Sequence, residues 1–347
     1  MENGGLTHRR KSEHIDICLN EPVQSRLSSG FDQYRFIHQA LPEIDLSEVR
    51  LSAHFLGKPV NTPFLVSSMT GGTEEAAAIN RNLAIAAQQR GWSLGIGSMR
   101  AALEDEHSAP TFEVRKYAPT IPILANLGLV QLNYGYGLEQ CKRAVELIGA
   151  DALLFHLNSM QEVFQPEGDT NFSGLLQKLE RICSAIGVPV GVKEVGWGID
   201  GPTAARLYNA GVAFVDVAGA GGTSWSEVER KRGTDAVRAA AAEAFADWGI
   251  PTAVCVHSVR SCCPDGVIVA SGGISNGVAA AKAVVLGADM IGFGRSLLGA
   301  ATHSTEQVEA LFERIEAEFT FAMFGVGVST IAQLKDARHL LVKHQSA

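Results

Sequence analysis

The sequence lacks the features of several large protein classes. Its 347 residues contain no uninterrupted apolar run near the roughly 18 residues of a membrane span, and the polar start at residues 1–5 has no apolar stretch of a signal peptide. Charged residues make up only 19% of the chain, and the net charge of −8 disfavours general binding of nucleic acid. The six cysteines form no C-x-x-C pair, which favours reduced packing thiols. These absences predict a soluble cytoplasmic protein without a nucleic-acid or membrane partner.

What the sequence does have is a regular alternation of apolar and helical segments. From about residue 60 onward, short apolar runs alternate with helical stretches, which is typical of βαβ units around a parallel sheet. The runs predicted as strands are Phe64–Met69, Trp92–Ser98, Ile121–Leu127, Ala152–Leu157, Pro189–Glu194, Ala213–Ala218, Val267–Ser271 and Met290–Gly294. Eight nearly continuous apolar strands favour a closed (β/α)8 TIM barrel over residues 51–347. Residues 1–50 contain no comparable unit and are predicted to be an N-terminal extension that crosses the barrel.

The stretches between the strands carry helix signals and often end at glycine, as helix C-caps do. The predicted helices are Glu74–Arg90, Leu138–Ile148, Leu175–Ile186, Thr203–Asn209 and Val278–Leu286. Two connections are longer, at residues 158–174 and 219–266, and the second has room for extra helices at Asp235–Trp248 and Thr252–Cys262. Long loops in a barrel are usually functional.

Polar side chains gather at the predicted carboxyl ends of the strands, where barrels of this kind form their active sites. His156 and Lys193 each follow an otherwise apolar run, and burying an ionisable group there costs several kcal/mol unless it has a partner. Strand ends also become polar simply because loops begin there. For the whole set, a ligand is the better explanation.

Glycine-rich segments follow the last three predicted strands. Residues 270–275 and 292–296 come after strands seven and eight, where loops of such barrels commonly bind phosphate and where Arg295 would add a cation. FMN is the usual phosphate-bearing cofactor of such a site. The run Val215–Trp225 holds three glycines followed by Thr223, which could hold the cofactor phosphate or ring edge; the alternative is a flexible loop.

Taken in order, these residues resemble the type 2 isopentenyl-diphosphate isomerase family across nearly the whole chain. The matching stretches are Arg10–His14, Phe64–Gly72, Gly97–Arg100, Ala125–Gly128, Phe155–Glu162, Gly168–Phe172, Val192–Gly196 and Val215–Trp225. The patterns H-x-N-x-x-Q-E, K-E-V-G and G-G-T-S-W in this order are highly specific. One position departs, because many members have serine where Ala218 stands, and this puts one hydroxyl contact to the flavin in doubt.

The resemblance implies a TIM barrel that binds reduced FMN and Mg²⁺, uses NADPH as reductant, takes a small diphosphate substrate, and assembles as a homotetramer or homo-octamer. The residues implied to contact FMN are Ser68, Met69, Thr70, Ser98, Asn126, Lys193, Thr223, Gly273, Ile274, Ser275, Gly294 and Arg295. Those implied to bind substrate are Arg10, Lys11, Ser98, Met99, Arg100, His156, Asn158 and Gln161, with Glu162 on the metal. Gln161, Lys193 and His156 are the implied catalytic residues. The N-terminal extension would thus contribute to the substrate site.

The implied reaction moves a double bond between isopentenyl and dimethylallyl diphosphate, so one proton is added and another removed. Protonating an alkene builds tertiary carbocation character, which an electron-rich reduced flavin can stabilise. Three alternatives stay open at this point: another FMN barrel enzyme such as a 2-hydroxy-acid oxidase, a nucleotide dehydrogenase, and a catalytically silent phosphate-binding barrel. The dehydrogenase is disfavoured because no cysteine lies between Gly219 and Pro251.

Overall fold

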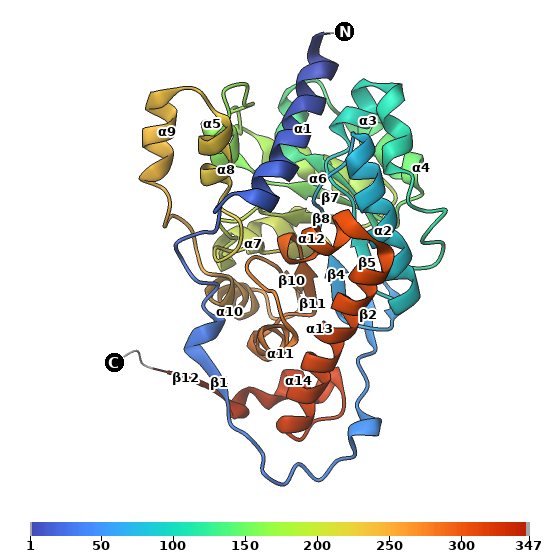
Figure 1. The fold of residues 1–347 in the computed structure, drawn as a ribbon, viewed down its shortest axis with the longest axis vertical. Helices are drawn as coiled ribbons and strands as arrows, with labels where there is room; N and C mark the ends of the chain where they lie inside the picture. The colour runs from blue at the N-terminus through green and yellow to red at the C-terminus, as the bar shows by residue number, and fades with distance from the viewer. Residues whose placement is uncertain (1, 345–347) are drawn as a thin grey trace.

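A closed barrel of eight parallel strands forms the centre of the computed structural model, which describes residues 2–344 (Figure 1). Its strands are β4 (Phe64–Val66), β5 (Ser93–Gly95), β6 (Ile123–Gly128), β7 (Ala152–His156), β8 (Val190–Lys193), β9 (Phe214–Asp216), β10 (Val267–Ala270) and β11 (Met290–Phe293). Each pairs in parallel with the next, and β11 closes onto β4. The prediction of eight strands in a TIM barrel is therefore confirmed. Most strands are shorter than predicted, because their polar ends lie in loops.

Helices surround the barrel. They include α2 (Glu74–Arg90), α4 (Leu138–Ile148), α6 (Leu175–Ala185), α7 (Gly201–Asn209), α10 (Thr252–Cys262), α11 (Gly277–Leu286) and α13 (Thr305–Gly325). The bounds predicted for α2, α4 and α10 are confirmed to the residue. The first, α2, begins where the Thr73 hydroxyl accepts the N–H of Ala76, and ends at Gly91, whose φ of 71° suits glycine. In the segment 235–248, only α9 (Ala236–Glu243) is helical.

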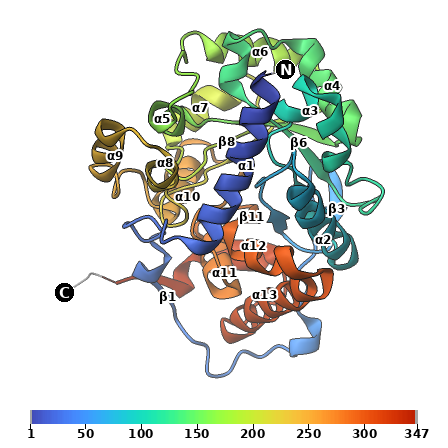
Figure 2. The same ribbon diagram turned by 45° about the horizontal axis from the view of Figure 1, so that its top comes forward.

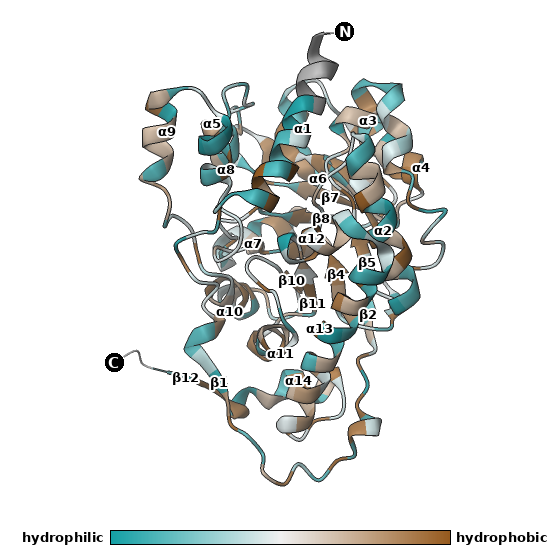
Figure 3. Ribbon diagram, viewed as in Figure 1, coloured by the Kyte–Doolittle hydropathy of each residue, from teal (hydrophilic) through white to brown (hydrophobic). Residues whose placement is uncertain are grey.

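Shorter helices stand in the loops at the carboxyl ends of the strands. These are α3 (Arg100–Glu104), α5 (Ser159–Phe164), α8 (Trp225–Arg232) and α12 (Arg295–His303). In Figure 3 the barrel strands are mostly brown, the colour of apolar residues, as expected for strands that are buried. A last short helix, α14 (Ile331–Asp336), follows α13.

The opposite end of the barrel is closed by a hairpin that the sequence analysis did not predict. Its strands are β2 (Ala53–Phe55) and β3 (Lys58–Val60). The buried Phe55 and Val60 pack with residues from the starts of the barrel strands, and the Phe55 and Phe214 rings meet edge to face at 5.2 Å. The hairpin thus excludes water from the barrel interior, so the open end is the one at the strand carboxyl termini.

The N-terminal extension crosses that open end, as predicted, but it does so as a helix. The helix α1 (Glu2–Asn20) lies across the mouth of the barrel and contacts α8, α3 and α12 (Figures 1 and 2). Further along, β1 (Tyr34–Phe36) pairs antiparallel with β12 (Leu341–Lys343), which fastens the extension to the C-terminal segment. Within residues 2–344, no helix combines the length and apolar character needed to cross a membrane. The six cysteines are free, as expected.

Candidate active site

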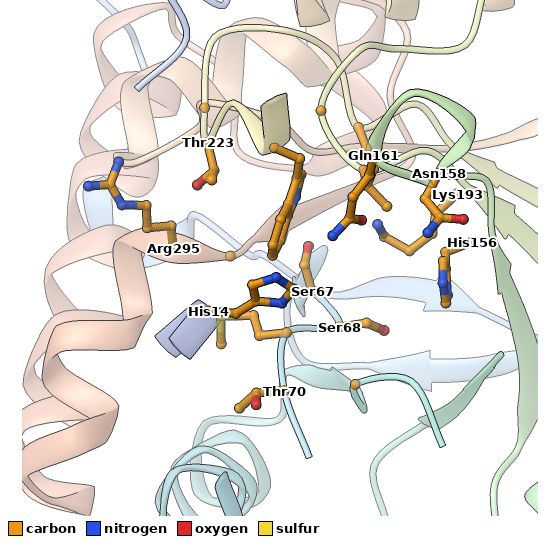
Figure 4. Close-up of a pocket in the computed structure, with 18 of the residues that line it drawn as sticks. His14, Ser67, Ser68, Thr70, His156, Asn158, Gln161, Lys193, Thr223 and Arg295 are labelled. Carbon is orange, nitrogen blue, oxygen red and sulfur yellow. The ribbon is translucent and has the colours of Figure 1, made fainter. Parts of the chain in front are cut away.

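A cavity of about 630 Å³ lies at the carboxyl ends of the strands, beneath α1 (Figure 4). The loops after all eight strands contribute to its wall, and α1 contributes five side chains, from Arg10 to Cys18. Its volume is in the range of small-molecule and cofactor pockets. Every residue that was predicted from the sequence to form the site lines this cavity, with the exception of Met99.

Met99 does not line the cavity. Its side chain is fully buried in the hydrophobic core, and its main-chain N–H donates to the carbonyl of Asn126 at 2.8 Å. The neighbouring residues Ser98 and Arg100 do line the cavity. The assignment of Met99 to the substrate site is thus not supported, because the turn from β5 into α3 directs this one residue into the core.

Two glycine-rich loops form one half of the cavity. A Cβ atom at Gly222 would lie 2.7 Å from the backbone nitrogen of Gly273, and one at Gly273 would lie 2.5 Å from the carbonyl carbon of Gly221. The loops after β9 and β10 therefore pack backbone to backbone, and only glycine permits this approach. The Thr252 hydroxyl donates to the Gly272 carbonyl at 2.6 Å and secures the contact.

The same half of the cavity fits a phosphate-bearing cofactor. The helix α12 begins at Arg295 after Gly294, so its free N–H groups face the glycine loops. Among the residues that the structure describes, the buried hydroxyls of Ser67 and Ser68 line the cavity without a hydrogen-bond partner. Buried hydroxyls normally have partners, so a polar ligand at this wall is expected.

Arg295 has partners of its own in this structure. Its Nε donates to the carbonyl of Cys18 at 2.9 Å, and one terminal nitrogen donates to the Gln24 side chain at 3.3 Å. The guanidinium therefore holds the end of α1 beside the cavity; Figure 4 shows Arg295 at the edge of the cavity. The sequence analysis predicted a phosphate contact for Arg295; the structure brings it to the cavity wall and adds this second role.

Lys193 lines the cavity at the end of β8, in a row of residues that crosses neighbouring strands. The strand register pairs His156 with Lys193 and Lys193 with Asp216. The Lys193 ammonium is buried and donates to the main-chain carbonyl of Glu194. Burial lowers the pKa of Lys193 below the ordinary lysine value, because it outweighs the opposing charges of Asp216 and Glu194. The Lys193 side chain therefore lies at the cavity wall with two buried acidic side chains beside it.

Glu194 also fixes the loop after β8. Its Oε2 accepts the main-chain N–H groups of four successive residues, from Val195 at 2.7 Å to Gly198 at 3.2 Å. Burial raises the pKa of Glu194, and these hydrogen bonds lower it. The carboxylate thus shapes the wall formed by Val195 and Gly196 next to Lys193.

A cluster of cations forms the other half of the cavity. The Lys11 ammonium donates to the carbonyl of Ser98 at 3.1 Å, and burial together with the charge of Arg10 lowers its pKa to about 7. Arg100 donates to Glu104 at 2.8 Å and to Asp169 at 2.9 Å. Three cations from α1 and α3 thus face one wall in an otherwise acidic chain, as an anionic ligand requires.

The H-x-N-x-x-Q-E pattern lies beside these cations. His156 Nδ1 and Asn126 Oδ1 are 2.7 Å apart, and burial and the charge of Lys193 lower the pKa of His156 to about 3, so its ring is neutral. Glu162 accepts from the Asn158 amide at 2.6 Å and from the N–H of Asp169 at 2.7 Å.

Gln161 is held by a carboxylate that the sequence analysis did not identify. The buried Glu229 of α8 accepts from the Gln161 amide at 3.1 Å and pairs with His14 at 2.9 Å and Arg232 at 2.8 Å. The contacts with His14 and Arg232 lower the pKa of Glu229 to about 2. One carboxylate therefore joins α1, α5 and α8 around the cavity.

Comparison with known proteins agrees with this geometry. The model of the FMN-dependent dehydrogenase family matches residues 149–341. The chain is 51% identical over 347 residues to an isopentenyl-diphosphate delta-isomerase of Oceanobacillus iheyensis, covering 100% of this chain and 99% of that protein. An enzyme of the same name from Nostoc sp. is 49% identical over 335 residues, covering 96% of each chain. The chain belongs to the isopentenyl-diphosphate delta-isomerase family.

The chain is also similar to solved structures that are described as oxidases. A mandelate oxidase variant with benzaldehyde has a TM-score of 0.66 at 18% identity and covers 100% of this chain and 98% of its own. A Pediococcus acidilactici protein described as a putative lactate oxidase has a TM-score of 0.64 at 18% identity, covering 91% of this chain and 85% of its own. At this identity the likeness shows the barrel fold alone.

Within the isomerase family, the departure at Ala218 is compatible with the cavity. Ala218 lines it with a φ of +37°, an uncommon conformation for a residue other than glycine, and its N–H lies 3.3 Å from a carboxylate oxygen of Asp216.

Other residues at or near the cavity, including Gln131 and Glu229, could not be identified from the sequence. They lie inside helical segments, where no sequence pattern distinguishes them from ordinary helix residues.

Proposed function

We propose that the chain interconverts isopentenyl and dimethylallyl diphosphate, with FMN in the glycine-rich half of the cavity and the diphosphate in the cationic half. The observation that supports this most is the union of the two halves in one cavity under α1. A cluster formed by Arg10, Lys11 and Arg100 beside the glycine-rich half suits a substrate with a diphosphate group.

The residues around the glycine loops would hold the cofactor. Main-chain N–H groups of the loops and of the start of α12, with the hydroxyls of Ser67, Ser68 and Thr223, would bind FMN. Reduced FMN supplies an electron-rich ring against which positive charge on the hydrocarbon can develop. Lys193 lines the same cavity, and its ammonium would balance negative charge on the reduced ring.

Other side chains would orient the reacting hydrocarbon. Gln161 is kept in place by Glu229, and its amide can position the alkene or a water molecule but is too weak an acid to protonate an alkene. His156 is neutral, and because its Nδ1–H donates to the amide oxygen of Asn126, its Nε2 is left as an acceptor for a water molecule or a substrate donor. The helix α1 excludes bulk water from the cavity, which strengthens the electrostatic interactions inside.

Glu162 would bind Mg²⁺ together with the diphosphate. Among residues 2–344, no cluster of three or more acidic, cysteine or histidine side chains could hold a metal unaided. This fits Mg²⁺, which commonly takes one or two carboxylates and completes its shell with phosphate oxygens and water. The Mg²⁺ requirement, NADPH as reductant, homo-oligomers and a cytoplasmic location stay predictions from the sequence.

One set of incubations tests the proposal. Purified protein is given isopentenyl diphosphate with FMN, Mg²⁺ and NADPH, and each component is omitted in turn while dimethylallyl diphosphate is measured. We expect product only with reduced FMN, without consumption of NADPH in step with product. Equal activity of FMN-free protein contradicts the proposal. Stoichiometric NADPH consumption, or reduction of bound FMN by a 2-hydroxy acid, favours an oxidoreductase.

A further inference from the structure

Asp169 stands in the stretch Gly168–Phe172, which has no role in the proposed function so far. The loop that carries it follows α5, and its side chain is partly exposed beside the cavity. Its Oδ2 accepts from Arg100 at 2.9 Å and from Gln131 at 2.9 Å, while its main-chain N–H donates to Glu162 at 2.7 Å. One residue therefore joins the loops that follow β5, β6 and β7.

Contacts of the surrounding loop fix Asp169 in this position. A Cβ atom at Gly168 would collide with the carbonyl oxygen of Glu162, so only glycine lets the chain pass so close to α5. On the other side, the Asn133 amide donates to the carbonyls of Asn171 at 2.7 Å and Ser173 at 3.0 Å. Asp169 is thus held from both sides by the loops that carry the proposed ligands.

The hydrogen bonds of Arg100 indicate that Asp169 positions the guanidinium and does not compete with a phosphate ligand for it. Arg100 uses its Nε for Glu104 and one terminal nitrogen for Asp169, so two of its five N–H donors are engaged and others remain for a phosphate. The two carboxylates hold the plane of the guanidinium, and a fixed plane can bind a phosphate through two parallel hydrogen bonds.

We infer that Asp169 is a positioning residue that sets Arg100 and Glu162 in the geometry required to bind a Mg²⁺–diphosphate group. This inference rests on the proposed function, because Arg100 and Glu162 are assigned to substrate and metal there. Partners that orient metal and anion ligands typically change affinity or activity by roughly tenfold to a hundredfold when removed.

The test compares Asp169→Ala with two other variants. We expect Asp169→Ala to raise both the KM for isopentenyl diphosphate and the Mg²⁺ concentration for half-maximal activity by about tenfold or more, with a smaller change in kcat and none in FMN affinity. Asp169→Asn keeps an acceptor oxygen for Arg100 and Gln131, so it should restore part of the loss. Glu104 contacts Arg100 but not the loop that carries Glu162. Glu104→Gln should therefore raise the KM and leave the Mg²⁺ dependence unchanged.

Asp151 offers a matched control far from the cavity. It accepts from Arg115 at 2.7 Å and from the N–H of Ile123 at 2.8 Å, so it has the same kinds of partner at the other end of the barrel. Asp151→Asn should lower the melting temperature without changing either constant. If Asp169→Ala behaves like this control, Asp169 is only structural and the inference fails.

Binding of inorganic diphosphate with Mg²⁺, measured by calorimetry, separates this inference from the proposed function. If the wild-type protein does not isomerise but binds diphosphate in an Asp169-dependent manner, the function fails and the inference stands. If the wild-type protein isomerises while Asp169→Ala binds diphosphate equally well, the inference fails alone. Tighter binding by Asp169→Ala would show that Asp169 competes with the anion for Arg100, and would also overturn it.

Discussion

Lys11 gives the proposed diphosphate site a pH dependence. Its ammonium lies under α1 against the carbonyl of Ser98 and 4.9 Å from the centre of the Phe112 ring. Burial, with a smaller contribution from Arg10, lowers its pKa to about 7. A diphosphate bound beside it favours the charged form, so the pKa of Lys11 rises in the complex.

The sign and size of the effect follow from this difference. Above pH 7 the free protein loses the Lys11 proton, and binding must restore it, so the affinity falls as the pH rises. With a pKa of about 7 when free and one near the ordinary lysine value when bound, the affinity should fall roughly tenfold per pH unit between pH 7.5 and 9. The last phosphate ionisation has a pKa near 6, so it adds little in this window.

Calorimetry of isopentenyl diphosphate with protein carrying oxidised FMN measures this directly. In buffers of different ionisation enthalpy, we expect uptake of nearly one proton at pH 8.5 and much less at pH 6. Lys11→Arg keeps the charge at every pH and should show neither the uptake nor the slope. A wild-type affinity that stays constant from pH 7 to 9, or an equal slope in the arginine variant, would refute the assignment of Lys11 to the substrate.

Three further substitutions test other parts of the site. Glu162→Gln should raise the Mg²⁺ requirement about tenfold or more with unchanged FMN affinity, and an identical magnesium titration would contradict its role as a metal ligand. Lys193→Ala removes a buried charge worth about 3–5 kcal/mol, so FMN affinity and turnover should fall together; a lower melting temperature of FMN-free protein with normal FMN affinity would indicate a structural pairing instead. Glu229→Gln should destabilise the protein by about 3–5 kcal/mol in urea unfolding and lower kcat, because His14 and Gln161 lose their common partner; unchanged kcat would show that Gln161 needs no such support.

The barrel was predictable because its signals are local. Each strand is a nearly continuous apolar run, and each outer helix carries its own start and stop residues, such as Thr73 and Gly91 around α2. The location of the candidate site could be predicted as well, because barrel topology brings the carboxyl ends of all strands to one rim. Position along the strand was thus enough to collect His156 and Lys193 in one cavity.

The parts that escaped prediction depend on distant contacts. The helix α1 is polar and begins with two glycines, so its propensity is weak, and contacts such as His14 with Glu229 hold it over the barrel. The pairing of Arg100 with Asp169 joins residues 69 positions apart in two loops. The burial of the Met99 side chain could not be predicted, because sequence adjacency to Arg100 says nothing about which way a side chain turns at the end of a strand.

The cations assigned to the diphosphate come from outside the barrel. The TM-score of 0.66 at 18% identity to a mandelate oxidase shows a shared barrel fold, and a shared fold does not by itself select the reaction. In this chain, Arg10 and Lys11 reach the cavity from α1, which is not part of the barrel. The same helix is linked through Glu229 to Gln161 and through Arg295 to the glycine-rich half. The helix that supplies the cations for the diphosphate is therefore also the element that joins the two halves of the cavity into one site.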